Sequence, residues 1–139
     1  MREIKFRAWN IKTKVMFYVA EMSWLVGGFY ITDGAVFSGF VEDNFIIMQF
    51  TGLKDKNGKE IYEGDVVKYT YLPGKTFWNF DGIGIVSWQS TGFHLGVLEN
   101  MGGVSAWLVS LPGLGASEKP NELLEIIGNI YENPELLRS

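Results

Sequence analysis

The sequence predicts a mainly β protein of short antiparallel strands that close into small barrels, with a short helix near the C-terminus. Composition is the first observation: 17 glycines stand against 4 prolines, and aromatic residues make up 15% of the chain. This combination favours strands and tight turns over long helices. The second observation is a period-two alternation of apolar and polar residues in several runs. The third is that Gly-containing turn signals separate those runs.

A length of 139 residues allows one domain with a substantial core, or two small lobes that share an interface. We expect a single domain over residues 1–139, which would subdivide, if at all, into an N-terminal sub-lobe over 1–48 and a barrel over 49–139. Apolar residues make up 47% of the chain, so the hydrophobic driving force is ample and wholesale disorder is not expected.

The first element that we expect is a hairpin over residues 3–19. Apolar residues at positions 4, 6 and 8 alternate with Lys5, Arg7 and Trp9, which predicts a half-buried strand with its basic side chains on the outer face. A polar connector over residues 10–14 then leads into a second strand over 15–19.

The next segment, residues 21–44, is rich in glycine and aromatic residues. Gly27-Gly28 and Asp33-Gly34 are turn signals, and a short strand over residues 29–32 lies between them. After this segment, residues 45–50 form a continuous apolar run, which predicts a strand buried on both faces.

Residues 49–69 contain three turn devices between strand-like runs. Asn57-Gly58 predicts a type I′ hairpin turn, since both central residues of that turn need a positive φ and these two residue types adopt it at least cost. Further on, Gly64 is expected to take a left-handed conformation, and Asp65 to cap the turn through its own side chain.

The strand that follows begins with Gly64-Asp65-Val66-Val67, which is typical of small SH3-like barrels, an analogy of fold that says nothing about function. A long hairpin loop over residues 72–82 comes next, and strands are expected over 83–88, 93–97 and 106–109. Short strands at this spacing favour a closed or nearly closed SH3-like barrel.

The last elements are a strand and a short helix. Residues 125–131 are read as a strand, because Gly128 costs a helix about 1 kcal/mol. Asn133 is a good N-cap, Pro134 suits the first helical position and Glu135 complements the helix dipole. We therefore expect a helix of one or two turns to begin at Pro134.

Two blocks of this sequence resemble the YopX family of phage and prophage proteins. The run TGLKDKNGKEIYEGD over residues 51–65 matches the family signature nearly residue for residue, and GNIYENPELL over residues 128–137 is similar to the typical family ending. The resemblance also covers the beginning of the chain, whereas residues 21–44 and 72–117 match only in general character. It implies a phage or prophage protein, in a family with no assigned biochemical activity.

No residue pattern in the chain points to catalysis. The chain has no cysteine and therefore no disulfide, thiolate nucleophile or sulfur-ligated zinc site. His94 is the only histidine, and its alternating surroundings favour a half-exposed strand residue over a general base. Turn capping and solvation account for the acidic residues between Asp55 and Asp65, which are interleaved with lysines. We expect no enzyme, no cofactor and no metal, although catalysis by His94 or by these carboxylates stays as a third hypothesis.

Charge is unevenly distributed along the chain. Residues 1–20 carry a net charge of +4 and residues 118–139 a net charge of −3. The two ends could pair within one molecule or head to tail between molecules, and two solvated faces account for the pattern as well. An alternative function is weak nucleic-acid binding through the basic N-terminal residues Arg2, Lys5, Arg7, Lys12 and Lys14. A sequence pI near 5.0 and the scarcity of cations after Lys75 argue against it.

The function that the sequence favours is non-catalytic binding of a protein partner or self-assembly into a homo-oligomer. The five tryptophans are expected in the core or at a subunit interface. Trp78 and Phe80 on the long loop are the predicted partner-binding residues, since loop aromatic residues have little other reason to be there. A charged N-terminus without the apolar region of a signal peptide, and no apolar run long enough to span a bilayer, predict a cytoplasmic protein of the bacterial host.

Overall fold

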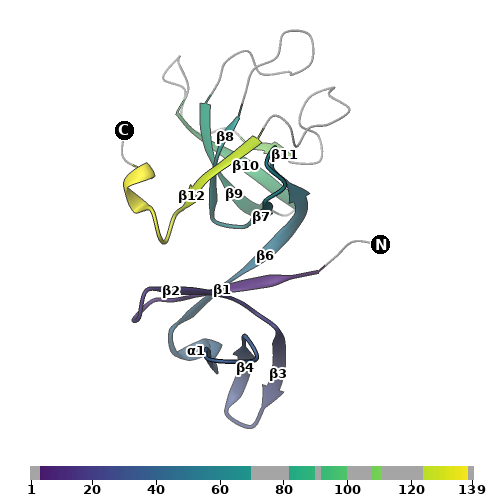
Figure 1. The fold of residues 1–139 in the computed structure, drawn as a ribbon, viewed down its shortest axis with the longest axis vertical. Helices are drawn as coiled ribbons and strands as arrows, with labels where there is room; N and C mark the ends of the chain where they lie inside the picture. The colour runs from purple at the N-terminus through teal and green to yellow at the C-terminus, as the bar shows by residue number, and fades with distance from the viewer. Residues whose placement is uncertain (1–3, 70–81, 90–91, 100–107, 111–123, 138–139) are drawn as a thin grey trace. The chain divides into compact units, whose positions relative to one another are not determined.

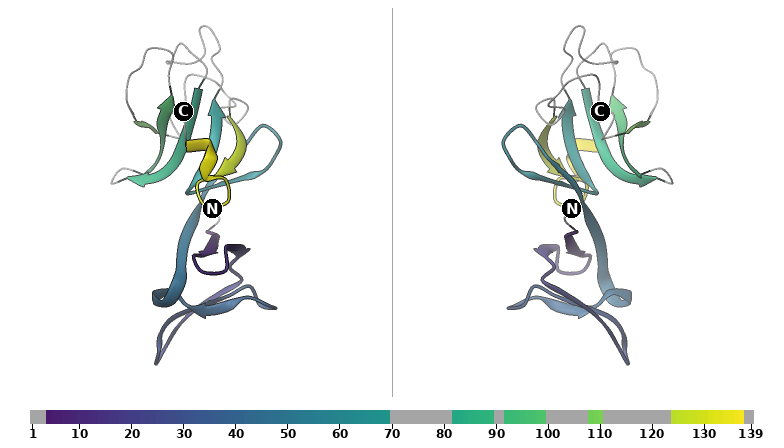
Figure 2. Two further views of the ribbon diagram at one scale, coloured as in Figure 1. Left: turned by 90° about the vertical axis from the view of Figure 1, so that its left-hand side faces the viewer. Right: turned by 90° about the vertical axis from the view of Figure 1, so that its right-hand side faces the viewer.

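The computed structural model describes residues 4–69, 82–89, 92–99, 108–110 and 124–137. Across these ranges the chain is built from short antiparallel strands, with a four-residue helix and a 3₁₀ turn besides, so the mainly β prediction is confirmed (Figure 1). The chain divides into two compact units, Met1–Phe50 and Thr51–Ser139. Strand β6 (Phe45–Lys54) runs without a break from the first unit into the second (Figures 1 and 2).

The first unit begins with the predicted hairpin, formed by β1 (Phe6–Asn10) and β2 (Val15–Tyr18). Its connecting loop is one residue shorter than expected, because Asn10 pairs with Val15 and belongs to the strand. On its other side β1 pairs antiparallel with the first half of β6, from Phe6↔Gln49 to Asn10↔Phe45. Strand β1 is therefore the middle strand of the order β2-β1-β6.

A separate three-stranded sheet forms from the glycine-rich segment that follows. Its strands are β3 (Glu21–Leu25), β4 (Gly28–Thr32) and β5 (Ser38–Phe40), in the order β3-β4-β5. The short helix α1 (Val41–Asn44) leads from β5 into β6 and contacts β4. The predicted strand over residues 29–32 is confirmed as the main part of β4.

Side chains from both sheets form the core of the first unit. Ala8 and Phe17 of the β1–β2 hairpin and Ile31 of β4 are buried together, and partly buried apolar side chains surround them. The Phe17 ring stacks on Phe37 at a centroid distance of 5.5 Å and meets Phe45 edge to face at 5.8 Å. The two small sheets thus stabilise each other through a shared aromatic core.

The alternation predicted for β1 is wrong in one respect. Arg7, expected on an outer face, is only 6% exposed, and Ile4, expected inside, lies largely in solvent. Residues 7–9 are buried in succession, so side chains on both faces of β1 are covered. In a strand that is covered on both faces, a period-two pattern cannot show which face is solvent-exposed.

The second unit holds a five-stranded antiparallel sheet in the order β11-β10-β9-β8-β12. Its strands, in chain order, are β8 (Asp65–Tyr69), β9 (Gly82–Gln89), β10 (Gly92–Glu99), β11 (Leu108–Ser110) and β12 (Leu124–Asn129). A further strand, β7 (Glu60–Tyr62), pairs with β6. Each predicted strand of this half has a counterpart in this set. Among the described strands, β11 and β12 are the two edges of the sheet, and its closure into an SH3-like barrel stays a prediction.

The turn between β6 and β7 differs from the predicted type I′ turn. A positive φ occurs at Gly58 (+79°) and not at Asn57. The Asp55 N–H donates to the Lys59 carbonyl at 2.8 Å and the Gly58 N–H donates to the Asp55 carbonyl at 3.0 Å, which makes a loop of three residues ending in a left-handed glycine. The Asp55 side chain selects this turn, since its Oδ1 accepts the N–H groups of Asn57 and Lys59, both at 2.9 Å.

The turn before β8 has the predicted form. Gly64 has a φ of +85°, and Oδ2 of the buried Asp65 accepts a hydrogen bond from the Tyr62 N–H at 2.8 Å. The Gly64 N–H donates to the Val86 carbonyl and the Gly64 carbonyl accepts from the Ile130 N–H, which ties this turn to both neighbouring segments. The left-handed glycine and the side-chain cap are therefore confirmed.

At the C-terminus the predicted strand is confirmed as β12, and the predicted helix is one 3₁₀ turn, η3 (Pro134–Leu137). A bulge interrupts β12 between Ile126 and Gly128, which breaks its period-two alternation. The Oδ1 of Asn133 accepts a hydrogen bond from the Asn129 N–H at 3.2 Å and so joins η3 to the end of the strand. A Cβ at Gly128 would lie 2.6 Å from that same oxygen, so glycine is needed where η3 folds back on β12.

Candidate functional site

Exposed apolar side chains gather at the end of the β3–β4 hairpin, which we call the hairpin tip and define as residues 24–29. Trp24 is 80% exposed, Leu25 is 50% exposed and Val26 is fully exposed. Folded proteins carry single exposed apolar residues routinely, but three in succession on one turn are unusual and typical of an interaction site.

The backbone of the hairpin tip packs against Phe40 and Glu42. A Cβ at Gly27 would lie 2.8 Å from the Phe40 ring, and one at Gly28 would lie 2.8 Å from a carboxylate oxygen of Glu42. Gly28 also has a φ of +128°, which favours glycine. The two glycines therefore let the turn pack against β5 and α1, and this packing leaves the neighbouring apolar side chains in solvent.

The two aromatic rings of the hairpin tip support each other. Trp24 and Phe29 are opposite residues in the β3–β4 register, and their rings stack at a centroid distance of 4.6 Å and an angle of 20°. The Phe29 N–H lies 3.5 Å from Oε1 of Glu42. The exposed indole is therefore a partly ordered anchor, and ordering it on binding costs less side-chain entropy than ordering a free side chain.

Negative charge beside the hairpin tip comes from Glu42, whereas Glu21 and Asp33 lie at the opposite end of the β3–β4 hairpin. The sequence from Val15 to Leu53 contains no Lys or Arg and includes four acidic residues, which are Glu21, Asp33, Glu42 and Asp43. The hydrogen bond from the Ala35 N–H is the largest of the causes that lower the pKa of Asp33, so this carboxylate is charged at neutral pH. A partner that matches this region would combine apolar contact with positive charge.

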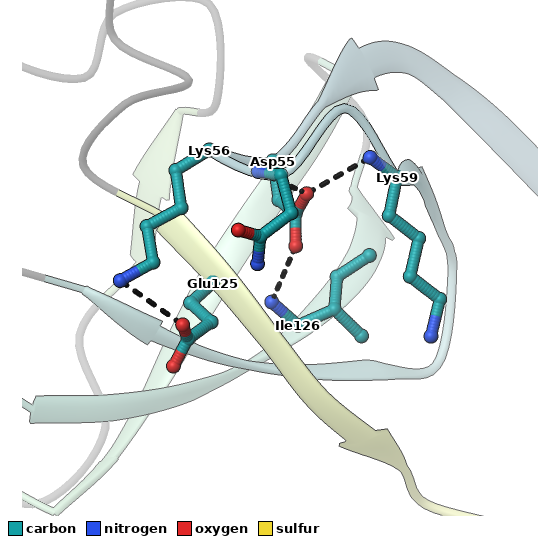
Figure 3. A network of polar contacts seen from close by, with 6 residues as sticks. Asp55, Lys56, Lys59, Glu125 and Ile126 are labelled. Atoms are coloured by element: carbon teal, nitrogen blue, oxygen red, sulfur yellow. Dashed lines mark hydrogen bonds and ion pairs between the residues drawn. The ribbon is translucent and has the colours of Figure 1, made fainter.

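A second polar centre lies in the other unit around Asp55, which is only 2% exposed (Figure 3). Its Oδ1 holds the β6–β7 turn, and its Oδ2 accepts the N–H of Ile126 in β12 at 3.0 Å. The Lys56 N–H donates to the Leu124 carbonyl at 2.9 Å, and the Lys56 Nζ lies 3.0 Å from the Glu125 carboxylate. The turn thus supplies hydrogen bonds to the edge of β12 that faces away from β8.

Burial alone would raise the pKa of Asp55, but hydrogen bonds from the N–H groups of Ile126, Lys59 and Asn57 together outweigh it and lower the pKa. The carboxylate is therefore ionised at neutral pH, and its bonds are made to the backbone. Asp65 serves the same purpose at the next turn. In the ranges that the structure describes, no group of three or more His, Asp or Glu side chains is placed to hold a metal ion. We read both aspartates as structural.

The predicted nucleic-acid residues do not share one face. Arg7 is buried, whereas Lys12 and Lys14 are exposed on the β1–β2 loop. The Lys5 Nζ lies over the Phe50 ring, 5.6 Å from its centroid. Arg2 lies outside the described residues. The described part of the N-terminal hairpin therefore presents two loop lysines and no continuous basic stripe of the kind that binds a phosphate backbone.

The predicted partner-binding residues Trp78 and Phe80 lie outside the described ranges, as does Trp107. Of the other tryptophans, Trp9 is buried as expected, and Trp24 and Trp88 are largely exposed. The backbone of His94 pairs with Ser87 and Ser110, because its strand β10 lies between β9 and β11 in the five-stranded sheet.

Sequence reasoning missed the hairpin tip, although Gly27-Gly28 was identified as a turn. The available signal was the placement of Trp24, Leu25 and Val26 immediately before that turn. Turns are ordinarily polar because their side chains face water. An apolar run that enters a two-glycine turn therefore marks side chains that the fold itself leaves exposed.

Comparisons with known proteins agree on the family. The YopX protein family model matches residues 5–138. The crystal structure of protein EF1440 from Enterococcus faecalis is similar with a TM-score of 0.61 and 25% sequence identity, over 99% of this chain and 100% of that one. The crystal structure of protein yopX from Bacillus subtilis is similar with a TM-score of 0.57 and 20% identity, again over 99% and 100%.

No match was found among curated proteins. The described part of the chain contains no helix that is long and apolar enough to cross a membrane. The family model covers nearly the whole chain, and it includes both sequence blocks that suggested the family. The chain therefore belongs to the YopX protein family.

Proposed function

We propose that this protein works by binding protein surfaces through the hairpin tip and catalyses no reaction of its own. The observation that carries the proposal is the exposure of Trp24, Leu25 and Val26 on a turn whose backbone is packed against Phe40 and Glu42. A rigid turn with exposed apolar side chains is the form that an interface anchor takes before its partner arrives.

The hairpin tip can supply part of the energy of specific binding. Full burial of a large apolar side chain contributes about 1.5–3 kcal/mol, and Trp24 and Val26 are nearly all in solvent in the free protein. Tryptophan is also enriched among the residues that dominate interface energetics. A partner pocket that accepted these side chains would gain several kcal/mol. Lost translational and rotational freedom costs about 4–15 kcal/mol, so the rest of the interface has to contribute as well.

The absence of catalysis is supported by how the acidic residues of the family signature are used. The carboxylates of Asp55 and Asp65 accept backbone N–H groups in two turns. A carboxylate that is buried and committed to backbone donors is poorly placed to act as a general base or nucleophile. The presence of these two aspartates in the family signature is therefore explained by their role in folding.

We also propose a biological setting. The two sequence blocks that resemble phage and prophage proteins favour a phage or prophage gene whose product acts in the cytoplasm of the bacterial host. We further propose that the second unit closes as an SH3-like barrel. In that setting the hairpin tip would engage either a host or phage protein or a second copy of the chain.

The test is affinity purification of the tagged protein from a lysate of a phage-bearing bacterium that also expresses an untagged copy. The wild type is compared with Trp24→Ser/Val26→Ser and with Trp88→Ser, a matched control that removes an exposed tryptophan of the second unit. We expect a stoichiometric protein, either a host or phage protein or the untagged copy, with the wild type and the control but not with the double variant. Equal recovery with all three proteins would refute the proposal.

A further inference from the structure

The β1–β2 loop, residues 11–14, offers a surface complementary to the hairpin tip. Ile11 is 45% exposed, and Lys12 and Lys14 are exposed beside it. The loop therefore combines an apolar side chain with two cations. The hairpin tip combines apolar side chains with the carboxylate of Glu42, in a segment without any Lys or Arg.

The conformation of this loop is fixed. Oδ1 of Asn10 accepts the N–H groups of Lys12 at 2.9 Å and Thr13 at 3.0 Å, and the Lys14 N–H donates to the Asn10 carbonyl at 2.9 Å. Lys14 has a φ of +60°, the one positive φ of a non-glycine residue in the described chain. A strained lysine in a well-bonded loop is consistent with a surface whose shape matters.

We propose that the hairpin tip of one copy docks on the β1–β2 loop of a second copy, in a head-to-tail arrangement. This inference rests on the proposed function and names its partner. Trp24 and Val26 would contact Ile11, and Glu42 would face Lys12 and Lys14. Within one copy the hairpin tip stays in solvent, so its own loop does not cover it.

A symmetric contact between two hairpin tips fits the charges less well. It would bring the Glu42 carboxylates of both copies together with no Lys or Arg from residues 15–53 to offset them, and like charges in an interface are unfavourable. A head-to-tail contact leaves one free tip and one free loop on every dimer, so association continues into rings or longer chains.

The first experiment is sedimentation velocity over a wide range of protein concentration, at low and high salt. We expect the mean mass of the wild type to rise with concentration beyond a dimer, and association to weaken severalfold at high salt because ion pairs contribute. A wild type that stays monomeric under every condition overturns this inference. Tip-dependent capture of another protein from the lysate would in that event leave the proposed function standing.

The second experiment mixes two defective proteins. Trp24→Ser/Val26→Ser removes the hairpin tip and keeps the loop, whereas Lys12→Glu/Lys14→Glu removes the loop cations and keeps the tip. Each alone should associate at least tenfold more weakly than the wild type. Their mixture should form a dimer that does not grow, because it pairs one intact tip with one intact loop.

The control is Lys54→Glu/Lys59→Glu, which makes the same charge change at two exposed lysines of the second unit and should associate as the wild type does. Circular dichroism checks that each variant is folded. Val26→Glu, at a fully exposed position, replaces the tip variant if that protein does not fold. Failure of the mixture to form a dimer, or full association of either defective protein alone, overturns the head-to-tail contact.

Discussion

The hairpin tip of the first unit and the aspartate turns of the second unit place apolar and charged side chains in opposite ways. In the first unit Trp24 and Val26 lie in solvent at the end of a hairpin, although the unit has its own aromatic core. In the second unit the carboxylates of Asp55 and Asp65 lie inside and accept backbone N–H groups. Each arrangement is costly unless something compensates for it.

The compensation differs between the units. The second unit satisfies its buried carboxylates within the chain, through two turns and the edge of β12. For the exposed apolar side chains of the hairpin tip, the described chain shows no comparable compensation beyond the stacking of Trp24 on Phe29. Buried carboxylates therefore serve folding in one unit, and we propose that exposed apolar surface serves binding in the other. Measurements of stability can test this division, and the largest effect is expected for the tryptophans.

Two tryptophans of the first unit should differ sharply in their importance for stability. Trp9→Ala removes a ring that is 5% exposed, and we expect a loss of about 3–5 kcal/mol in the free energy of unfolding. Trp24→Ala removes a ring that is 80% exposed, and we expect a loss below about 1 kcal/mol, chiefly from its stacking on Phe29. Urea unfolding followed by far-UV circular dichroism measures both values.

Trp88→Ala in the second unit serves as the control for loss of an exposed tryptophan. Similar losses from Trp9→Ala and Trp24→Ala would contradict the division, since the hairpin tip would then be part of the folded core.

Two aspartates that hold turns should likewise differ in their importance for stability. Asp55→Ala leaves three backbone N–H groups of a nearly buried site without their acceptor, and we expect the free energy of unfolding to fall by about 3 kcal/mol. Asp33→Ala also removes two backbone N–H contacts, from Ala35 and Phe37, but its turn is exposed and water can replace the carboxylate. Its effect should be clearly smaller in the same urea titration.

Amide hydrogen exchange adds a local check on the Asp55 variant. The Ile126 N–H should exchange faster in Asp55→Ala, because its acceptor is gone. Unchanged protection at this amide would show that β12 is held without the carboxylate.

Local chemistry was predictable from the sequence where a turn depends on one residue. Gly64 and Asp65 fold as expected because a left-handed glycine and a side-chain cap act within a few residues. The turn at Asn57-Gly58 was located correctly but given the wrong type. The deciding interaction comes from Oδ1 of Asp55, which accepts the N–H groups of Asn57 and Lys59.

Long-range placement was not predictable. The alternation around Arg7 indicated a strand correctly, but burial on both faces of β1 depends on packing against segments distant in sequence, such as Ile31 of β4 beside Ala8. The exposure of the hairpin tip was not predicted, for a related reason. Tryptophan is a residue type that is often found in protein cores. The exposure of Trp24 follows from how Gly27 and Gly28 pack on Phe40 and Glu42.

Stability should fall in acid through Asp55. Its pKa in the folded state is below the ordinary value of 3.8, so the ionised form favours the folded state. That stabilisation is fully present above pH 3.8 and is lost as the pH falls through the lower folded-state pKa. The total loss should be smaller than for Asp55→Ala, because a protonated carboxyl keeps its carbonyl oxygen as an acceptor.

The pH dependence is best measured as a difference between the wild type and Asp55→Asn, since other carboxylates titrate in both proteins. We expect the curve of unfolding free energy against pH to be flatter for the variant below about pH 4. Parallel curves would show that the titration of Asp55 is not linked to folding, which would argue against buried charge as a stabilising feature of the second unit.

The smallest effect is expected from the ion pair beside Asp55. The Lys56 Nζ lies 3.0 Å from the Glu125 carboxylate, and the two side chains are 48% and 33% exposed. Pairs of this kind typically contribute about 0.2–1 kcal/mol and weaken with salt. A double-mutant cycle of Lys56→Gln and Glu125→Gln, measured by urea unfolding at two salt concentrations, gives the coupling energy between the two side chains.

The backbone bond from Lys56 to Leu124 stays in both variants, so the cycle separates charge pairing from backbone bonding at one turn. A coupling above about 2 kcal/mol would show that ion pairing holds this turn to β12, whereas a small coupling beside a large effect of Asp55→Ala would assign that role to backbone hydrogen bonds accepted by the carboxylate.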